Sequence, residues 1–523
     1  MHVEQGLEAV ELGTGPLAAR DIVAVARHGA RVDLAPEALA AMASSRSVID
    51  NLAADDKPHY GVSTGFGALA VKQIPPYQRT QLQRSLIRSH AASSGAEVDR
   101  EVVRALMLNR LSTLATGRTG VRPGIALAYA GLLNAGITPV VGEYGSLGCS
   151  GDLAPLSHCA LALMGEGEVR TPDGRMLPAA TALADAGLTP VQLREKEGLA
   201  LINGTDGMLG MLTLALADLH RLLSTADLAA AMSVEGLLGS DSVFAADLQE
   251  LRPQHGQAES AANIRSILAG SVLIEEHKTG GFTRVQDAYS LRCAPQVHGA
   301  ARSTLAHAES VAAAERASAV DNPVVTPDGR LESNGNFHGA PVAYVLDFLA
   351  IAVADVASMS ERRTDRFLDR SRSHGLNAFL AHDPGVDSGH MIAQYTQAGI
   401  VSELKRLAVP ASVDSIPSSA MQEDHVSMGW AAGLKLRRAL DGLTRVLAIE
   451  LLTAARALDM RDGGLATTRS APAVAAGRAA IREVVAGPGP DRYLAPEIEA
   501  VRVLVDGGTL LAAVEDRLGT RLY

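Results

Sequence analysis

Runs of apolar residues at helical spacing extend through most of the chain. Residues 214–239 (LALADLHRLLSTADLAAAMSVEGLLG) and 342–363 (VAYVLDFLAIAVADVASMSERR) repeat Leu, Val and Ala at this spacing, with few strand-like alternations between them. The periodicity is longest and most continuous from about residue 201 to 475. Polar loops interrupt it around 252–262, 274–298 and 320–341. This pattern predicts a mainly α protein with a long central up-down helical bundle.

The first 200 residues follow a different pattern, in which short helical segments alternate with glycine-dense turns. These turns are YGVSTGFGALA (60–70), TGRTGVRPG (116–124) and VVGEYGSLGCSGDLAPLSH (140–158). Loops of this kind usually present functional groups rather than build a core. Near the other end, GPGPDRYLAPEIE (487–499) forms a Pro/Gly hinge before a last helical stretch. We predict a mixed, loop-rich N-terminal domain (1–200), the central bundle (201–475) and a C-terminal helical segment (476–523).

Composition narrows the function classes. Only 3% of the 523 residues are aromatic, so the core must be aliphatic and rich in Ala. The net charge is −11 and no basic run is long enough to follow a phosphate backbone, so we expect no nucleic acid partner. The N-terminus carries acidic residues and no signal-like apolar core, and Asp347 and Asp355 interrupt the most apolar internal window. We therefore expect a cytoplasmic protein that does not span a membrane.

The cysteines point to no metal and no disulfide framework. Cys149, Cys159 and Cys293 form no pair with metal-ligand spacing, and their odd number leaves one unpaired. The histidines include no H-E-x-x-H motif or comparable paired spacing, so structural histidines are the expectation for His425 and the others. The chemistry must come from another feature of the sequence.

That feature is the serine in GSLGCSGDLAP. A nucleophile elbow, G-x-S-x-G, needs glycine two positions on either side of Ser150, but position 152 is Asp. A phosphate-binding loop needs Lys-Ser/Thr after the glycines or a G-x-G-x-x-G motif, and neither is present. Two interpretations are left, a tight turn and a backbone self-condensation. On the triplet alone the turn is the commoner outcome.

In the self-condensation, the amide nitrogen of Gly151 attacks the carbonyl carbon of Cys149. Two waters are lost, one of them from the side chain of Ser150. Glycine suits the attacking position because it has no Cβ to block a close approach or a strained backbone. The product would be a methylidene-imidazolone, whose conjugated alkene is an electrophile that no ordinary side chain provides.

Further segments give the triplet a context. The chain resembles the aromatic amino-acid ammonia-lyase and aminomutase family over nearly its whole length, and most closely the branch that acts on histidine. Besides GSLGCSGDLAPLSH (145–158), the segments that carry the resemblance are YGVSTGFG (60–67), RSHAA (88–92), LINGTDG (201–207), QDAYSLRCAPQ (286–296), DNPVV (321–325), SNGNFHGAPVA (333–343) and SSAMQEDHVSMG (418–429). Several motifs in the family's order make a chance match improbable.

The resemblance implies a mainly helical homotetramer with a long central bundle and active sites built from loops of different subunits. It implies a methylidene-imidazolone formed from Cys149, Ser150 and Gly151, with no metal or dissociable cofactor. Two departures stand out. Many members have Ala where this chain has Cys149, although only the backbone of that residue joins the ring. Ser93 stands where a glycine commonly follows the Ala pair.

The implied reaction is the non-oxidative elimination of ammonia from L-histidine to give trans-urocanate, the first step of histidine degradation. Tyr60 matches the position that usually removes the β-hydrogen, and Tyr289 is a rival base or a gate over the ring. A phenol has a pKa of about 10, so a phenolate base requires a lowered pKa or alkaline conditions. Arg292 suits the substrate carboxylate because its planar fork donates two parallel hydrogen bonds. Without the resemblance, Tyr60 would be interpreted as a packed tyrosine and Arg292 as part of a surface ion pair.

Other residues take supporting roles under the same resemblance. Asn203 and Gln286 serve the amino or carboxylate group of the substrate and the ring carbonyl, unless they only satisfy buried backbone. Phe337 matches the position that packs beside the ring and helps it to form; the alternative is an ordinary core Phe. Asp152 aids ring closure, or else caps a helix N-terminus.

The substrate assignment depends on two positions. Phenylalanine-specific relatives carry Phe-Leu and tyrosine-specific ones His-Leu where this chain has Ser89-His90. In MQEDH, Glu423 can accept a hydrogen bond from an imidazole N–H, whereas those relatives have a Gln-Asp pattern. An isolated Glu would more often lie on a solvated helix face. Together His90 and Glu423 favour histidine. A tyrosine or phenylalanine ammonia-lyase or 2,3-aminomutase, and an inactive structural or ligand-binding homologue, are the alternatives.

Overall fold

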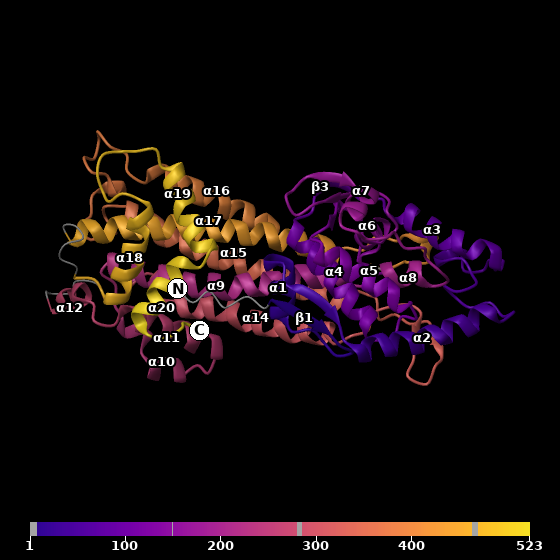
Figure 1. Ribbon diagram of the computed structural model, residues 1–523. Coiled ribbons are helices and arrows are strands. Elements are labelled where there is room, and N and C mark those ends of the chain that lie inside the picture. The colour runs from indigo at the N-terminus through magenta and orange to yellow at the C-terminus, as the bar shows by residue number, and fades with distance from the viewer. Residues whose placement is uncertain (1–7, 149, 280–284, 463–468) are drawn as a thin grey trace.

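The computed structural model describes residues 8–148, 150–279, 285–462 and 469–523. Figure 1 shows an elongated molecule in which long helices run along most of its length. Most of the N-terminal elements gather at one end of these helices (Figure 1). The mainly α architecture with a long central bundle confirms the fold class predicted from the hydrophobic periodicity.

Four long helices form the centre of the bundle: α9 (Asp206–Gly236), α14 (Ala294–Arg316), α15 (Ala340–Leu368) and α17 (Gly429–Asp462). With a rise of 1.5 Å per residue, the 34 residues of α17 extend over about 50 Å. α9 packs against the other three, and α15 also packs against α14 and α17. The buried faces consist mainly of Leu, Ala and Val, so aliphatic packing holds the bundle together.

Contacts at the helix ends show how the four helices are oriented. Thr205, just before α9, hydrogen-bonds to Glu315 near the end of α14. Gly236 at the end of α9 lies against Phe367 of α15 and Leu458 of α17. Thus α9, α15 and α17 run in one direction and α14 in the other. We call the end where α9, α15 and α17 begin the near end, and the end where they finish the far end.

Shorter helices surround the bundle. α16 (Met391–Leu407) packs against α15 and α17, and α11 (His255–Leu268) against α14 and α9. The remaining α-helices of this part are α10 (Ala246–Glu250), α12 (Val272–Thr279), α13 (Tyr289–Arg292), α18 (Pro472–Val484), α19 (Ala495–Asp506) and α20 (Thr509–Leu518). The 3₁₀ turns are η3 (Ser242–Phe244), η4 (Ala378–Leu380) and η5 (Ser419–Met421).

The N-terminal part is also mainly helical. It contains α1 (Ala19–His28), α2 (Pro36–Ala54), α3 (Arg79–His90), α4 (Arg100–Ala115), α5 (Pro123–Asn134), α6 (Leu153–Leu163), α7 (Ala179–Asp185) and α8 (Glu197–Ile202), with 3₁₀ turns η1 (Gly67–Leu69) and η2 (Pro76–Gln78). Helix α4 packs against α9 and is buried almost throughout, so it attaches this part to the bundle.

The strands are short, and within the described residues they form four small sheets. β1 (Ala9–Leu12) pairs in parallel with β2 (Arg31–Leu34). Antiparallel pairs are formed by β3 (Ser94–Glu97) with β5 (Gly142–Tyr144), by β6 (Glu168–Arg170) with both β4 (Thr138–Pro139) and β7 (Met176–Pro178), and by β8 (Val324–Val325) with β9 (Leu331–Glu332). Such short sheets fix the shape of loops rather than form a core layer.

Helix α15 has the length and apolar composition to cross a bilayer, and among the described residues it is the helix that does. However, 61% of its most apolar window is buried inside the protein. Its Asp347 is also buried, and the Oδ1 atom lies 2.5 Å from Nζ of Lys435 on α17. Helix α15 is therefore accounted for as a core helix of the bundle.

Candidate active site

The loop that carries the predicted triplet lies at the near end, between β5 and α6. Two other loops hold it there. The carbonyl oxygen of Gly148 accepts hydrogen bonds from Ser427 Oγ (2.8 Å) and from the Gly339 amide (3.3 Å). The Met428 amide donates to the Leu147 carbonyl (2.8 Å). Of the triplet, Ser150 and Gly151 are described, and Cys149 lies outside the described residues. Three segments distant in sequence therefore meet at the triplet.

Gly151 is in close backbone contact with Gly204, in the loop before α9. The two residues form an isolated parallel bridge, and the Asp152 amide donates to the Gly204 carbonyl (2.7 Å). Gly151 has φ +77°, and a Cβ there would lie 2.0 Å from the Gly204 oxygen. A Cβ on Gly204 would in turn lie 2.2 Å from Arg110 Nη2. Both positions require glycine, because a side chain at either one would collide with the neighbouring atoms. The backbone of the triplet therefore packs directly against the loop before α9.

Asp152 is fully buried behind the triplet. Its Oδ2 accepts from the amides of Gly207 (2.8 Å) and Met208 (2.9 Å) in the first turn of α9, and its Oδ1 accepts from Ser146 Oγ (2.9 Å). Asp152 precedes α6, but its side chain caps α9 instead. Burial raises the pKa of Asp152 to about 7, against the effect of these donors. The carboxyl group therefore exchanges a proton near neutral pH, within two residues of Ser150.

Glu423 lies directly beside the serine of the triplet. Ser150 Oγ donates to Glu423 Oε1 (3.2 Å), and Ser418 Oγ donates to Oε2 (2.9 Å). The charge of Glu423 raises the pKa of both Tyr60 and His90. Thus Glu423 contacts Ser150 directly and also acts on Tyr60 and His90, which come from two other motifs.

Tyr60 is half-buried, and its hydroxyl accepts a hydrogen bond from the Gly67 amide (3.3 Å). Burial raises the pKa of Tyr60, and the charges of Glu423 and Asp321 raise it further. The isolated chain thus favours the neutral phenol. A base role for Tyr60 requires either alkaline conditions or a cation that is added when the site is complete.

His90 ends α3, and its Nδ1 lies 3.0 Å from Ser89 Oγ. Burial lowers the pKa of His90, and the charge of Glu423 opposes that effect. The imidazole is therefore neutral at neutral pH and offers one donor and one acceptor to a polar ligand.

Asn203 and Phe337 complete the near-end set. Asn203 Nδ2 donates to the Asn322 carbonyl (3.2 Å), whereas Oδ1 is buried and accepts no hydrogen bond from the described residues. Phe337 is half-buried, two residues before Gly339, whose amide contacts Gly148. A buried amide oxygen without a donor is costly, so Asn203 Oδ1 is suited to receive one from a ligand.

Gln286, Tyr289 and Arg292 lie elsewhere, at the far end. The Ser240 amide, just past the end of α9, donates to Asp287 Oδ2 (2.7 Å), and Arg363 Nη1 near the end of α15 donates to the Ser290 carbonyl (3.3 Å). The 31 residues of α9 separate the two ends by about 45 Å. Within one chain these three residues therefore cannot act together with Ser150.

Two of the three far-end residues are exposed. Tyr289 is 69% exposed and Gln286 is exposed as well. Arg292 Cζ lies 4.7 Å from the centre of the Tyr289 ring, which is cation–π geometry. Arg292 Nε is buried and has no hydrogen-bond partner in the part of the chain that the structure describes. This Tyr–Arg pair can therefore receive a carboxylate or a second protein surface.

Some contributing residues were not predicted from the sequence. Ser146 and Ser427 hold the triplet loop, and both lie inside segments already singled out. Ser93, the unusual residue, has its Oγ 2.8 Å from His158 Nε2 and accepts there from the Gly142 amide (2.9 Å). The serine thus bonds the loop after α3 to β5 and α6. The signal available in the sequence was the polar character of these positions within glycine-dense motifs.

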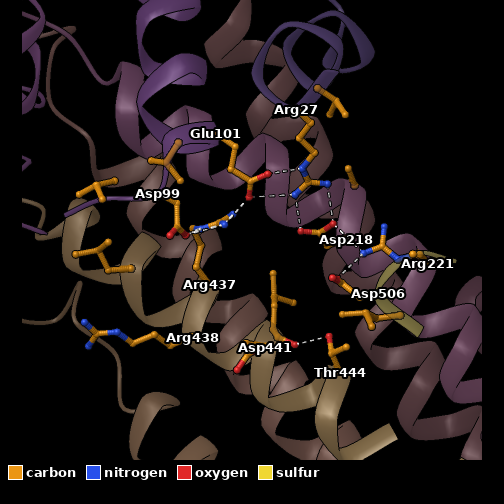
Figure 2. Close-up of a pocket in the computed structure, with 18 of the residues that line it drawn as sticks. Arg27, Asp99, Glu101, Asp218, Arg221, Arg437, Arg438, Asp441, Thr444 and Asp506 are labelled. Carbon is orange, nitrogen blue, oxygen red and sulfur yellow. Dashed lines mark hydrogen bonds and ion pairs between the residues drawn. The ribbon is translucent and has the colours of Figure 1, made fainter. Parts of the chain in front are cut away.

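A cleft of about 990 Å³ lies apart from this site, between α1, α4, α9, α17 and α19. In Figure 2, Arg27 points toward Glu101 and Asp218, whereas Arg438 points away from them. Arg27 bonds to Glu101 (2.6 Å) and Asp218 (2.8 Å), and Arg437 lies 3.0 Å from Asp99. None of the candidate site residues lines the cleft. Its charged side chains form ion pairs within the cleft or with neighbouring residues, and it contains none of the candidate residues, so its size does not make it the reaction site.

A family model of aromatic amino acid lyases matches residues 17–483. The chain belongs to the aromatic amino acid lyase family. The histidine ammonia-lyase of Streptomyces avermitilis is 63% identical over 514 residues, which cover 98% of this chain and 99% of that protein. The family fold is equally clear in solved structures. Tyrosine aminomutase from Streptomyces globisporus superposes with a TM-score of 0.92 at 38% identity, covering 98% of this chain and 100% of that one. Histidine ammonia-lyase from Trypanosoma cruzi gives 0.89 at 36% identity, covering 97% and 95%.

Proposed function

We propose that this family member eliminates ammonia from L-histidine to give trans-urocanate, the first step of histidine degradation, in the cytoplasm. The observation that carries the proposal is the position of Glu423. Its carboxylate lies 3.2 Å from Ser150 Oγ, and its charge raises the pKa of His90. The relative at 63% identity, named histidine ammonia-lyase, supports the same substrate. The far-end residues fit this proposal only when another subunit supplies them.

The residues at the triplet fit a methylidene-imidazolone. Gly151 contacts Gly204 so closely that any side chain would clash, Asp152 offers an exchangeable proton, and Asn203 Oδ1 has no donor among the described residues. Cys149, Ser150 and Gly151 would form the group. Once formed, it supplies an electrophilic carbon conjugated to a carbonyl, which turns the substrate amine into a better leaving group. No metal or dissociable cofactor is part of this proposal.

Glu423 and His90 orient the imidazole of the substrate. A carboxylate accepts the N–H of the imidazole, and the neutral His90 ring supplies a second polar contact. Asn203 Oδ1 accepts from the substrate amino group. In this proposal Phe337 packs beside the ring and helps it to form. These contacts fix the β-carbon relative to Ser150, which is the positioning that an elimination requires.

Removal of the β-proton falls to a tyrosine. Tyr60 is the candidate at the near end, and its hydroxyl already accepts a hydrogen bond from the Gly67 amide. Burial and the charges of Glu423 and Asp321 raise the pKa of Tyr60. An incoming guanidinium would lower this pKa and favour the phenolate. Tyr289, which lies beside Arg292, is the rival base or a gate.

An assembly of subunits, a homotetramer, brings the two ends together. Arg292 then binds the substrate carboxylate with its planar fork, and Gln286 supports it. Exposed apolar side chains favour an assembly: Tyr344, Phe348 and Ile351 lie on one face of α15 and are 49%, 46% and 47% exposed. A contiguous apolar face of this kind is typical of a protein interface.

Tyrosine or phenylalanine elimination, or a 2,3-amino shift, is the second candidate, because the tyrosine aminomutase structure shares the fold at a TM-score of 0.92. Product analysis decides between them. Incubation with L-histidine, L-tyrosine and L-phenylalanine separately should release ammonia and an absorbing acrylate from histidine alone. Release from tyrosine or phenylalanine at a comparable rate, or formation of a β-amino acid, would refute the histidine assignment. No turnover of any of the three would favour an inactive homologue.

A further inference from the structure

A buried ion pair lies behind the candidate site. Lys196, the residue before α8, and Asp321, before β8, both have side chains that are 0% exposed, and Lys196 Nζ lies 2.5 Å from Asp321 Oδ2. Burial lowers the pKa of Lys196, and the charge of Asp321 opposes that effect. Each charge in such a pair compensates the other, so removal of one leaves an uncompensated buried charge.

A continuous series of hydrogen bonds leads from this pair to Asn203. Asp321 Oδ1 accepts from the Asn322 amide (2.8 Å). Asn334 bonds to the same segment twice, through Nδ2 to the Asp321 carbonyl (3.0 Å) and through its amide to Asn322 Oδ1 (3.0 Å). The Asn322 carbonyl then accepts from Asn203 Nδ2 (3.2 Å). The Lys196–Asp321 pair thus fixes the acceptor that orients the Asn203 amide.

The backbone of Asn203 is fixed independently. Arg110 Nη1 donates to the Asn203 carbonyl (2.9 Å), and Arg110 Nη2 donates to the Val320 carbonyl (2.9 Å). With its carbonyl and its Nδ2 both held, the side chain of Asn203 has one orientation left. Its Oδ1 atom is buried and accepts no hydrogen bond from the described residues. The side chain is therefore preorganised for a donor from outside the chain.

We propose that Lys196 is a positioning residue of the active site, which acts through Asp321 and Asn322 to aim Asn203 Oδ1 at the amino group of the substrate. The inference rests on the proposed function, in which Asn203 contacts the substrate. Lys196 itself lies too deep to touch a substrate, because it is completely buried against Asp321. Its effect on turnover must therefore pass through Asn203.

The chain offers a matched control. Lys435 of α17 and Asp347 of α15 form another Lys–Asp pair, also at 2.5 Å, with Asp347 1% exposed. Their other partners are the Val409 carbonyl and the Ser412 amide, in the loop after α16. A loss of general stability from an unpaired buried carboxylate should therefore appear in Lys435→Met, without an effect on Asn203.

The test is a double-mutant cycle on the full-length enzyme at a temperature where each variant is folded, as judged by circular dichroism. Lys196→Met and Asn203→Ala should each lower kcat about 100-fold with a smaller change in KM. The double variant should lose about the same 100-fold, because the two residues act as one unit, whereas independent effects would multiply to about 10⁴-fold. Lys435→Met should keep the wild-type kcat. When it is combined with Asn203→Ala, the fold-losses in kcat of the two single variants should multiply. Lys196→Arg should recover part of kcat.

The proposal would be overturned if the fold-losses in kcat of Lys196→Met and Asn203→Ala multiply in the double variant. It would also be overturned if Lys196→Met folds and keeps the wild-type kcat. If Lys196→Met does not fold, Lys196→Met/Asp321→Asn replaces it in the cycle, because this variant leaves no unpaired buried charge. In every variant, an intact mass that is lower than the sequence mass by two waters shows that the methylidene-imidazolone has formed. The cycle can be run with whichever amino acid the wild type turns over, so another substrate would refute the proposed function and leave this test intact.

Discussion

The two ends of the bundle present their candidate residues in opposite ways. At the near end, Ser150, Glu423 and Asn203 are at least half-buried and held by hydrogen bonds from several loops. At the far end, Tyr289 is 69% exposed, and its main partner is the guanidinium of Arg292. The near-end side chains are held in place within the chain, whereas the far-end side chains lie largely on its surface.

Under the proposed function, this difference makes each end of the chain a half-site. In that proposal the near end recognises the imidazole and the amine, but its described candidate residues include no cation for a carboxylate. Arg292, the proposed cation, lies at the far end, about 45 Å away along α9. On this proposal neither end alone binds a whole amino acid. Assembly is therefore part of the catalytic proposal and not an addition to it.

The largest effect should come from Ser150→Ala, which removes the hydroxyl that leaves as water during ring formation. We expect kcat to fall by at least about 10³-fold, the two-water mass deficit to disappear and the near-ultraviolet absorbance to be lost. Intact-protein mass spectrometry measures the deficit directly. Wild-type protein of unaltered sequence mass would show that the near end does not carry this chemistry.

Mixing two inactive variants tests whether the half-sites come from different chains. Arg292→Met should lower kcat/KM about 100-fold, because a charge-assisted bond to the carboxylate is lost. When Ser150→Ala and Arg292→Met subunits are unfolded and reassembled together, about a quarter of the sites should contain both intact residues, and activity should return to about that fraction. Each variant reassembled alone is the control. Mixtures that stay inactive would place both residues in one chain.

Substrate recognition should be separable from ring formation at the near end. His90→Leu and Glu423→Ala should each reduce kcat/KM for L-histidine about 100-fold, since a buried polar contact to the imidazole is removed. The two-water mass deficit should persist in both variants. Loss of the deficit together with activity would mean that these residues serve the triplet rather than the substrate.

The smallest effect is a shift in pH dependence that distinguishes Tyr60 from Tyr289. Because the charge of Glu423 raises the pKa of Tyr60, Glu423→Gln should lower that pKa, and the phenolate should form at lower pH. The rising limb of the kcat/KM profile should then move to lower pH. Tyr289 lies at the far end of its own chain, so Tyr289→Phe serves for comparison. A limb that follows Tyr289→Phe and ignores Glu423→Gln would make Tyr289 the base.

Much of the fold could be predicted from the sequence, because helical periodicity is a local property. The long apolar segments around 214–239 and 342–363 correspond to α9 and α15. The departure at Ser93 was visible but could not be interpreted, since its partners His158 and Gly142 are brought to it by packing. The assignment of domains to 1–200, 201–475 and 476–523 stays a prediction.

The site was predictable as a set of motifs and not as an arrangement. Family resemblance selected Tyr60, His90, Glu423 and Arg292 alike, although the structure groups the first three and separates the last. Asp152 could be assigned either to ring closure or to a helix cap, and its side chain does cap a helix, α9 rather than the α6 that it precedes. The Lys196–Asp321 pair had no sequence signal, because nothing local indicates that two charges 125 residues apart are buried together.

The sequence by itself determined the helices, the family and the identity of the Cys149-Ser150-Gly151 triplet, because periodicity and motifs are read along the chain. Only the tertiary structure decided which groups meet. Ser150 and Glu423 are 273 residues apart and share a hydrogen bond, whereas Ser150 and Arg292 lie at opposite ends of a rigid bundle. Helix length and packing direction set these distances, and neither is encoded in any one motif.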